Sequence, residues 1–153
     1  MKNFIAILSL CFLWACNTNG SSQKEIPARH ADTLLHPHEE SKPELSLNNG
    51  AKWKADKSTN KHVKTLQATT DNFIKSNHTS LADYQYMADE LQGGIEKMIN
   101  ECRMKGADHD VLHKWLHPLL RQVKALKTAP ATGEATQAFE KIKQQLSLYN
   151  KYF

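Results

Sequence analysis

Apolar side chains recur at steps of three and four residues along most of the chain beyond residue 58, which places them on one face of a helix. This spacing predicts four amphipathic helices, over residues 59–76, 80–102, 108–127 and 132–150. No strand-like alternation and no long repeat accompanies them. Because the connections are short, neighbouring helices should be antiparallel. The pattern therefore predicts an all-α fold, an antiparallel up-and-down four-helix bundle.

Local signals add detail to these helices. Ser80, with Asp83 three residues later, is a capping-box pattern that predicts the start of the second helix. Gly93 and Gly94 interrupt that helix, each at about 1 kcal/mol relative to alanine, so they predict a close approach of a neighbouring helix or a kink. Trp53 should pack at one end of the bundle. The apolar stripe of the first helix is expected to contain Val63, Leu66, Phe73 and Ile74.

The N-terminal segment differs from the bundle. Lys2 precedes an apolar run over residues 4–14 that is too short to span a membrane as a permanent helix. The run ends in Leu-Trp-Ala-Cys, which resembles a bacterial lipobox, with Cys16 as the residue that receives the lipid. We therefore predict a lipoprotein signal peptide over residues 1–15 and a lipid anchor at Cys16. An ordinary cleaved signal or an uncleaved anchor is the alternative.

A polar segment separates this leader from the bundle. Residues 16–48 contain three prolines and no apolar period, which predicts a flexible linker, with the folded domain over residues 49–153. The linker carries His30, His36 and His38, and a mobile histidine-rich tract can collect metal ions loosely. The alternative is chance placement of these histidines in a polar segment.

Composition excludes some functions. The chain has 153 residues, enough for one domain. Loss of the leader takes Lys+Arg from 20 to 19 against 16 acidic residues, a balance of +3. These charges are mixed along the helices, whereas a nucleic-acid-binding protein needs a concentrated basic face. With Cys16 acylated, Cys102 is the one free thiol of the mature chain, so it is expected to be buried, metal-bound or paired with a partner.

Residues 102–118 hold most of the candidate chemistry: one thiol, one thioether, three imidazoles and two carboxylates. Gly106 is expected to close the second helix in a left-handed conformation, and Asp108 to cap the third. His109 and His113 lie four apart, so they share a helix face, with Cβ atoms roughly 5–6 Å apart. Two imidazoles at this spacing can hold one ion at about 2.0–2.1 Å each.

Other side chains extend this candidate metal site. Cys102 and Met104 can supply soft sulfur ligands, which favour Cu(I), whereas imidazoles also suit Cu(II) and zinc. His117 is too far from His109 to join that pair easily, but it can pair with His113. Asp108 or Asp110 can orient an imidazole. The predicted metal ligands are Cys102, Met104, His109, His113 and His117, with copper first and zinc second.

Structural roles are the alternative for each of these residues. Cys102 continues the apolar stripe of the second helix, after Ile95 and Met98, and a buried free cysteine is a common small hydrophobe. Met104 can simply fill a gap. The histidines can be satisfied core or capping residues.

Enzymatic functions have weaker support. The segment from His109 to His113 resembles the His-Glu-x-x-His helix of zinc proteases, but Asp110 is shorter than the usual general base and no histidine follows His117. Haem could bind only noncovalently, because no Cys-x-x-Cys-His sequence is present. Cys102 with His109 or His113 is the only nucleophile–base candidate, with no third orienting group, so no enzyme is predicted.

Three motifs resemble those of a group of small bacterial envelope proteins associated with heavy-metal handling, over about residues 45–153. They are Leu47-Asn48-Asn49-Gly50-x-Lys52-Trp53, Cys102-x-Met104-x-Gly106-x-x-His109-Asp110-x-Leu112-His113-x-Trp115-Leu116-x-Pro118 and Tyr149-x-x-Tyr152-Phe153. The resemblance implies metal binding, and a role in heavy-metal resistance, without fixing the metal.

These observations lead to one main hypothesis and one alternative. The chain is expected to be a metal-binding lipoprotein of the bacterial envelope, at the outer membrane facing the periplasm, that serves as buffer, sensor or carrier. Its partners would be the membrane, through the lipid, and a metal-efflux or metal-transfer protein, with no nucleic acid. The alternative is a structural or adaptor lipoprotein whose bundle presents a surface to an envelope partner.

Overall fold

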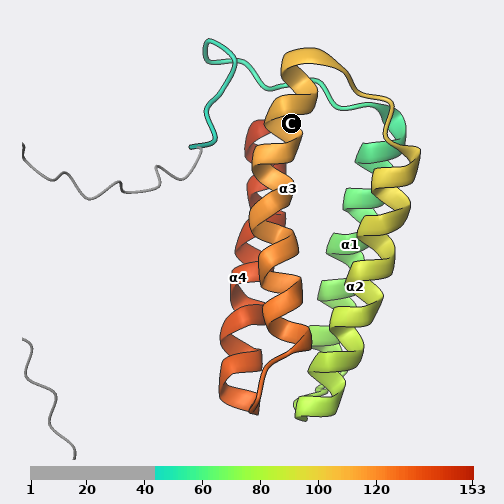
Figure 1. The fold of residues 1–153 in the computed structure, drawn as a ribbon, viewed down its shortest axis with the longest axis vertical. Coiled ribbons are helices and arrows are strands. Elements are labelled where there is room, and N and C mark those ends of the chain that lie inside the picture. The colour runs from blue at the N-terminus through green and yellow to red at the C-terminus, as the bar shows by residue number, and fades with distance from the viewer. Residues whose placement is uncertain (1–43) are drawn as a thin grey trace, which may run out of the picture. The chain divides into compact units, whose positions relative to one another are not determined.

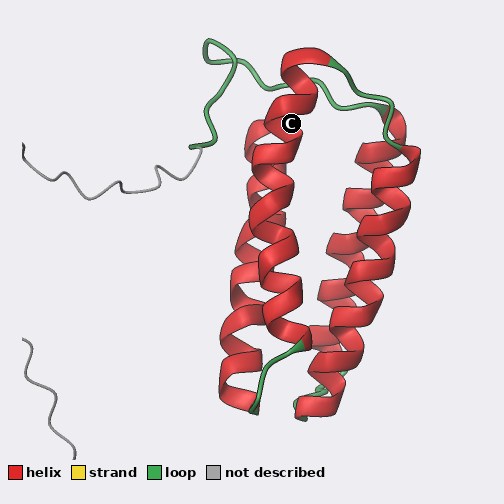
Figure 2. Ribbon diagram, viewed as in Figure 1, coloured by secondary structure: helices red, strands yellow, loops and turns green. Residues whose placement is uncertain are grey.

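The computed structural model describes residues 44–153, so the predictions for the signal peptide, Cys16 and the linker histidines lie outside the described residues. The described part contains α1 (Lys57–Lys75), α2 (Leu81–Glu101), α3 (Gly106–Lys127) and α4 (Thr132–Tyr152). Successive helices run in opposite directions and are joined by short connections (Figure 1). Every regular element of this part is a helix (Figure 2). The predicted all-α four-helix fold is confirmed.

The core forms where the apolar stripes of the four helices meet. Trp115 of α3 is fully buried, and its ring packs edge-to-face on Tyr149 of α4, with centroids 5.0 Å apart. Its indole N–H donates to the Gln145 carbonyl over 2.8 Å, and the Gln145 amide donates to the Trp115 carbonyl over 2.6 Å. This reciprocal pair satisfies polar groups that burial would otherwise leave unpaired, and it joins α3 to α4.

Helices α1 and α2 approach closely at Gly94. A Cβ atom added there would lie 2.7 Å from Cδ2 of Leu66, whereas one added at Gly93 would meet nothing within 4 Å. Of the two predicted roles for the glycines, close helix approach is therefore confirmed at Gly94. The capping box at Ser80 and Asp83 is also confirmed, with both reciprocal hydrogen bonds formed.

The predicted stripe of α1 is wrong at one position. Ile74 is 47% exposed, while its neighbour Phe73 packs against the core. Adjacent helical residues point about 100° apart, because 3.6 residues make a turn, so only one of the two can face the core. Buried Thr70 continues the stripe instead, and its hydroxyl donates to the Gln67 carbonyl over 2.7 Å.

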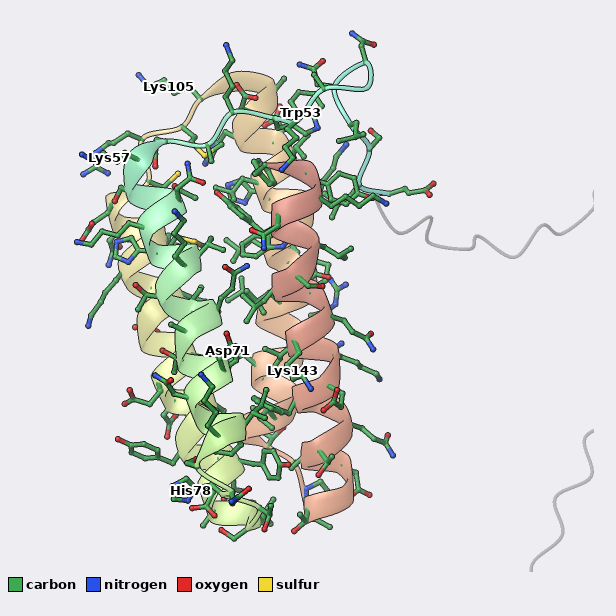
Figure 3. All side chains as sticks on the ribbon, turned by 180° about the vertical axis from the view of Figure 1, so that it is seen from behind. Trp53, Lys57, Asp71, His78, Lys105 and Lys143 are labelled. Atoms are coloured by element: carbon green, nitrogen blue, oxygen red, sulfur yellow. The ribbon has the colours of Figure 1, made fainter. Side chains whose placement is uncertain are left out.

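A strap formed by residues 44–56 crosses the end of the bundle where α2 stops and α3 starts (Figure 1). The backbone N–H of Trp53 donates to the Tyr152 carbonyl over 2.7 Å, and its indole N–H donates to the Ser46 carbonyl over 2.7 Å within the strap. Trp53 is half-buried and lies at one end of the bundle, as predicted. Figure 3 shows Trp53, Lys57 and Lys105 at this same end. None of the helices in residues 44–153 is long and apolar enough to cross a membrane.

The connection between α2 and α3 differs from the prediction. Helix α2 ends at Glu101, before Gly106, and Cys102 already has extended backbone. Gly106 does take a left-handed conformation, with φ +64°, but it begins α3 rather than closing α2. Asp108 is not the cap of α3; it lies in the first turn, and its carboxylate accepts the Lys54 N–H over 2.9 Å. The Asp108 carboxylate, which the sequence predicts as the cap of the third helix, therefore binds the strap instead.

Candidate metal centre

The thiol of the candidate centre lies on the non-helical connection between α2 and α3, residues 102–105, which is called the α2–α3 linker. A side chain from the strap holds this linker in place. Cys102 follows α2 directly, and the Asp56 carboxylate accepts the next N–H, that of Arg103, over 2.7 Å. The other oxygen of Asp56 accepts the Thr59 N–H over 2.6 Å and so caps α1. One carboxylate thus fixes the linker that carries the thiol against the start of α1.

The two imidazoles predicted to share an ion are neighbours on the first turns of α3. The Nε2 atoms of His109 and His113 are 3.2 Å apart, and the ring planes are inclined by 78°. Two nitrogens bound to one tetrahedral ion at ordinary Zn–N lengths are about 3.3 Å apart, from the bond length and angle. A hydrogen bond between the rings, with roles set by the tautomers, fits the same spacing. The pair therefore has the nitrogen separation of two ligands of one ion.

A small cavity of about 40 Å³ lies beside this pair. Its lining residues come from the end of α2, the linker and the first turns of α3: Met98, Ile99, Cys102, His109, Leu112, His113 and Leu116. The volume exceeds the roughly 10–15 Å³ that one water molecule requires by this measure, so a single ion fits. Thiol, thioether and imidazole groups share this cavity with aliphatic walls.

The structure brings three of the five predicted ligands to one cavity. Cys102 and His109 are half-buried there, and His113 lies at the exposed side. Met104 is half-buried against the core and does not line the cavity. His117 is exposed one turn beyond, with its ring centroid 5.6 Å from that of His113. His117 therefore adjoins the pair without reaching the thiol.

Met98 also lines the cavity, although the sequence assigned it only to the apolar stripe of the second helix. It is 1% exposed, as its place in that stripe requires. Its spacing of four residues from Cys102 is the one sequence signal that relates it to the thiol.

In residues 44–153, no group of three or more His, Cys, Asp and Glu side chains is placed to hold a metal ion. The two imidazoles are in position, and the thiol lines the same cavity. Asp108 is engaged by Lys54, and in the described part neither Asp108 nor Asp110 hydrogen-bonds to these rings. The predicted orientation of an imidazole by a carboxylate therefore has no hydrogen bond to support it.

The surroundings of His113 favour its neutral form. Partial loss of hydration lowers its pKa below the ordinary value of 6.5, the neighbouring His109 and His117 lower it further, and Asp110 acts in the opposite direction. A neutral imidazole is the form that binds metal. His113 therefore stays competent as a ligand at a lower pH than a free imidazole.

The remaining described histidines have partners in the bundle. His62 of α1 contacts Glu101 of α2 over 2.8 Å, and the Ser58 hydroxyl donates to the same carboxylate. His78 lies 3.3 Å from Asp83, the residue that completes the capping box of α2. The first contact joins α1 to α2, and the second holds the turn between these helices against the start of α2.

Comparison with known proteins adds no assignment: no family model, curated protein or solved structure matches the chain. The resemblance to small envelope proteins stays a prediction. What the molecule itself presents is a four-helix bundle with a cysteine and two adjacent histidines at one end.

Proposed function

We propose that this chain is a lipid-anchored transition-metal-binding protein of the bacterial cell envelope, with copper as the first choice of ion and zinc as the second. The observation that carries the proposal is the 3.2 Å separation of the His109 and His113 Nε2 atoms, beside a cavity that Cys102 also lines. Thiolate and imidazole together are ligands for Cu(I), Cu(II) and zinc.

Binding in this centre releases protons, because the thiol must lose its hydrogen and the imidazoles must be neutral. Affinity should therefore fall as the pH drops below the ordinary histidine value of about 6.5. The lowered pKa of His113 moves its part of this loss to more acid conditions.

The position of the centre suits exchange of its ion with another protein. His113 is exposed, and the cavity lies at the end of the bundle rather than in the middle of its core. We propose a buffer, sensor or carrier role, with the linker histidines collecting ions and a metal-efflux or metal-transfer protein receiving them. The lipid at Cys16 would hold the bundle at the outer membrane facing the periplasm.

Isothermal titration calorimetry with copper and zinc tests this function. The wild-type protein should bind one ion per chain, and the His109→Ala, His113→Ala double variant should lose that binding. A His62→Ala, His78→Ala double variant is the matched control, because it removes the same number of imidazoles away from the cavity. Absence of heat with both metals in the wild type contradicts the proposal.

A structural or adaptor lipoprotein without metal is the second candidate. A groove of about 390 Å³ between the end of α1 and the start of α2 favours it, since Phe73, Tyr86 and Met87 are among its lining residues. Tyr86 is 68% exposed, so its ring adds apolar surface to the edge of this groove. A wild type that binds neither metal would favour this candidate.

A further inference from the structure

The candidate centre has a fourth possible donor on the described part of α2. Met98 and Cys102 are four residues apart, which is about one helical turn, and both line the cavity that contains His109 and His113. Met98 is 1% exposed, so its thioether is shielded from water. The remaining lining residues are Ile99, Leu112 and Leu116, all aliphatic.

We propose that Met98, not Met104, is the thioether ligand of this centre, and that the resulting two-histidine, cysteine and methionine set selects Cu(I) over zinc. This inference rests on the proposed metal-binding function and specifies its ion. Soft thioether sulfur binds Cu(I) well, whereas zinc takes thiolate, imidazole and carboxylate ligands. The residues lining the cavity include no carboxylate to serve zinc as a fourth ligand.

Charge balance favours the same ion. Cu(I) replaces the proton of the Cys102 thiol: the S–H bond breaks, a Cu–S bond forms, and one proton leaves to solvent. With neutral imidazoles and a neutral thioether, the Cu(I) centre has no net charge, whereas the zinc centre keeps one positive charge. Leaving an uncompensated charge beside aliphatic walls is costly. The cavity therefore suits a singly charged ion bound to one thiolate.

The four donor side chains differ in how far they can move toward an ion. Met98 lies within α2, and His109 and His113 lie within α3, so the helices hold three of the donors. Cys102 lies on the linker between those helices and has extended backbone. No three His, Cys, Asp or Glu side chains of the described part are placed to hold an ion, and Asp56 holds the backbone next to Cys102. We therefore expect rotation of the Cys102 side chain, without movement of its backbone, to complete the set.

Competition titrations on the full-length protein in detergent test the role of Met98. Cu(I) affinity is measured anaerobically against a chromophoric Cu(I) chelator, and zinc affinity against a chromophoric zinc chelator. Met98→Leu keeps an apolar side chain of similar volume, so the core should stay folded. It should weaken Cu(I) binding by at least about 10-fold, because loss of a direct ligand should cost no less than the roughly 10–100-fold that follows loss of a group supporting a ligand. Zinc binding should change less than about twofold. Met104→Leu is the matched control and should change neither affinity.

X-ray absorption at the copper edge gives a readout that is independent of the affinity measurements. Wild-type protein loaded with Cu(I) should show two sulfur neighbours and two nitrogen neighbours around copper, and Met98→Leu should show one sulfur. Equal Cu(I) affinity in wild type and Met98→Leu, or a single sulfur neighbour in the wild type, overturns the role of Met98. If those results come with binding that still depends on His109 and His113, the proposed metal-binding function is supported and only the role of Met98 is refuted. A wild type that binds neither ion overturns both.

Discussion

At the scale of single residues, Asp56 stabilises two separate segments of the chain. Its carboxylate accepts the N–H groups of Thr59 and Arg103, so it caps α1 and also holds the linker that carries Cys102. Partial burial raises the Asp56 pKa, but the two backbone hydrogen bonds, the Thr59 side chain and the Arg103 charge outweigh it and lower the pKa below 3.8. The ionised carboxylate is therefore the form that stabilises the fold.

Replacing Asp56 with alanine should lower the free energy of unfolding by about 1–2 kcal/mol at neutral pH, the cost of losing a helix cap. Because the pKa is lower in the folded chain, the unfolded chain binds the proton first as the pH falls below 3.8. The contribution is thus present above pH 3.8 and is lost as the pH falls through the folded value. Urea denaturation across this range should show the difference from wild type shrinking in acid.

Asp71→Ala, on the exposed side of α1, is the matched control for charge removal. It should leave the free energy of unfolding within about 0.5 kcal/mol of the wild type, as expected for a surface substitution. Equal destabilisation by the two variants would contradict the role of Asp56 as cap and linker support.

At the scale of elements, the contact between α1 and α2 depends on the absence of one side chain. Gly94 leaves room for the side chain of Leu66, which is 2% exposed. Gly93 is the preceding residue of the same helix and has open space where its Cβ would be. Two adjacent glycines therefore have different roles, and they provide a matched pair of substitutions.

Gly93→Ala should raise the free energy of unfolding by about 0.5–1 kcal/mol, because alanine has the better helix propensity. Gly94→Ala gains the same propensity but forces the added methyl group against Leu66, at a cost of about 1–3 kcal/mol. Chemical denaturation followed by circular dichroism should therefore rank Gly93→Ala above wild type and Gly94→Ala below Gly93→Ala. Equal stability of the two variants would mean that α1 yields at this contact.

At the scale of the whole molecule, the proposed anchor and the proposed centre are separable. Cys16 lies outside the described residues, whereas the centre is built from α2, the linker and α3. A carrier of this kind needs the anchor for its location and the bundle for its chemistry. Each can be removed while the other is retained.

Cys16→Ala should abolish labelling by a radioactive fatty acid in bacteria that make the protein and should release the chain from the membrane fraction. The purified variant should keep the metal affinity of the wild type, since the centre does not include this residue. Cys102→Ala is the reciprocal control: it should keep the lipid label and lose affinity. A Cys16→Ala chain that stays labelled would refute the lipobox interpretation.

The four helices and the His109–His113 pair were predictable because each depends on local geometry. A period of 3.6 residues defines an apolar face, and residues four apart on a helix are neighbours wherever the helix lies. The capping box at Ser80 is local in the same sense. The sequence by itself thus determined the fold class and the imidazole pair.

Tertiary structure decided which other side chains join that pair. Met98 lines the cavity and Met104 does not, although the sequence favoured Met104 as the nearer thioether. Asp108 bonds to the strap at Lys54 instead of capping α3, and the linker is held by Asp56, 47 residues before Arg103. Distances between separate elements depend on where each helix ends and how the helices pack. The periodicity of one segment predicts neither the helix ends nor the packing, because both result from burying the apolar stripes of all four helices together.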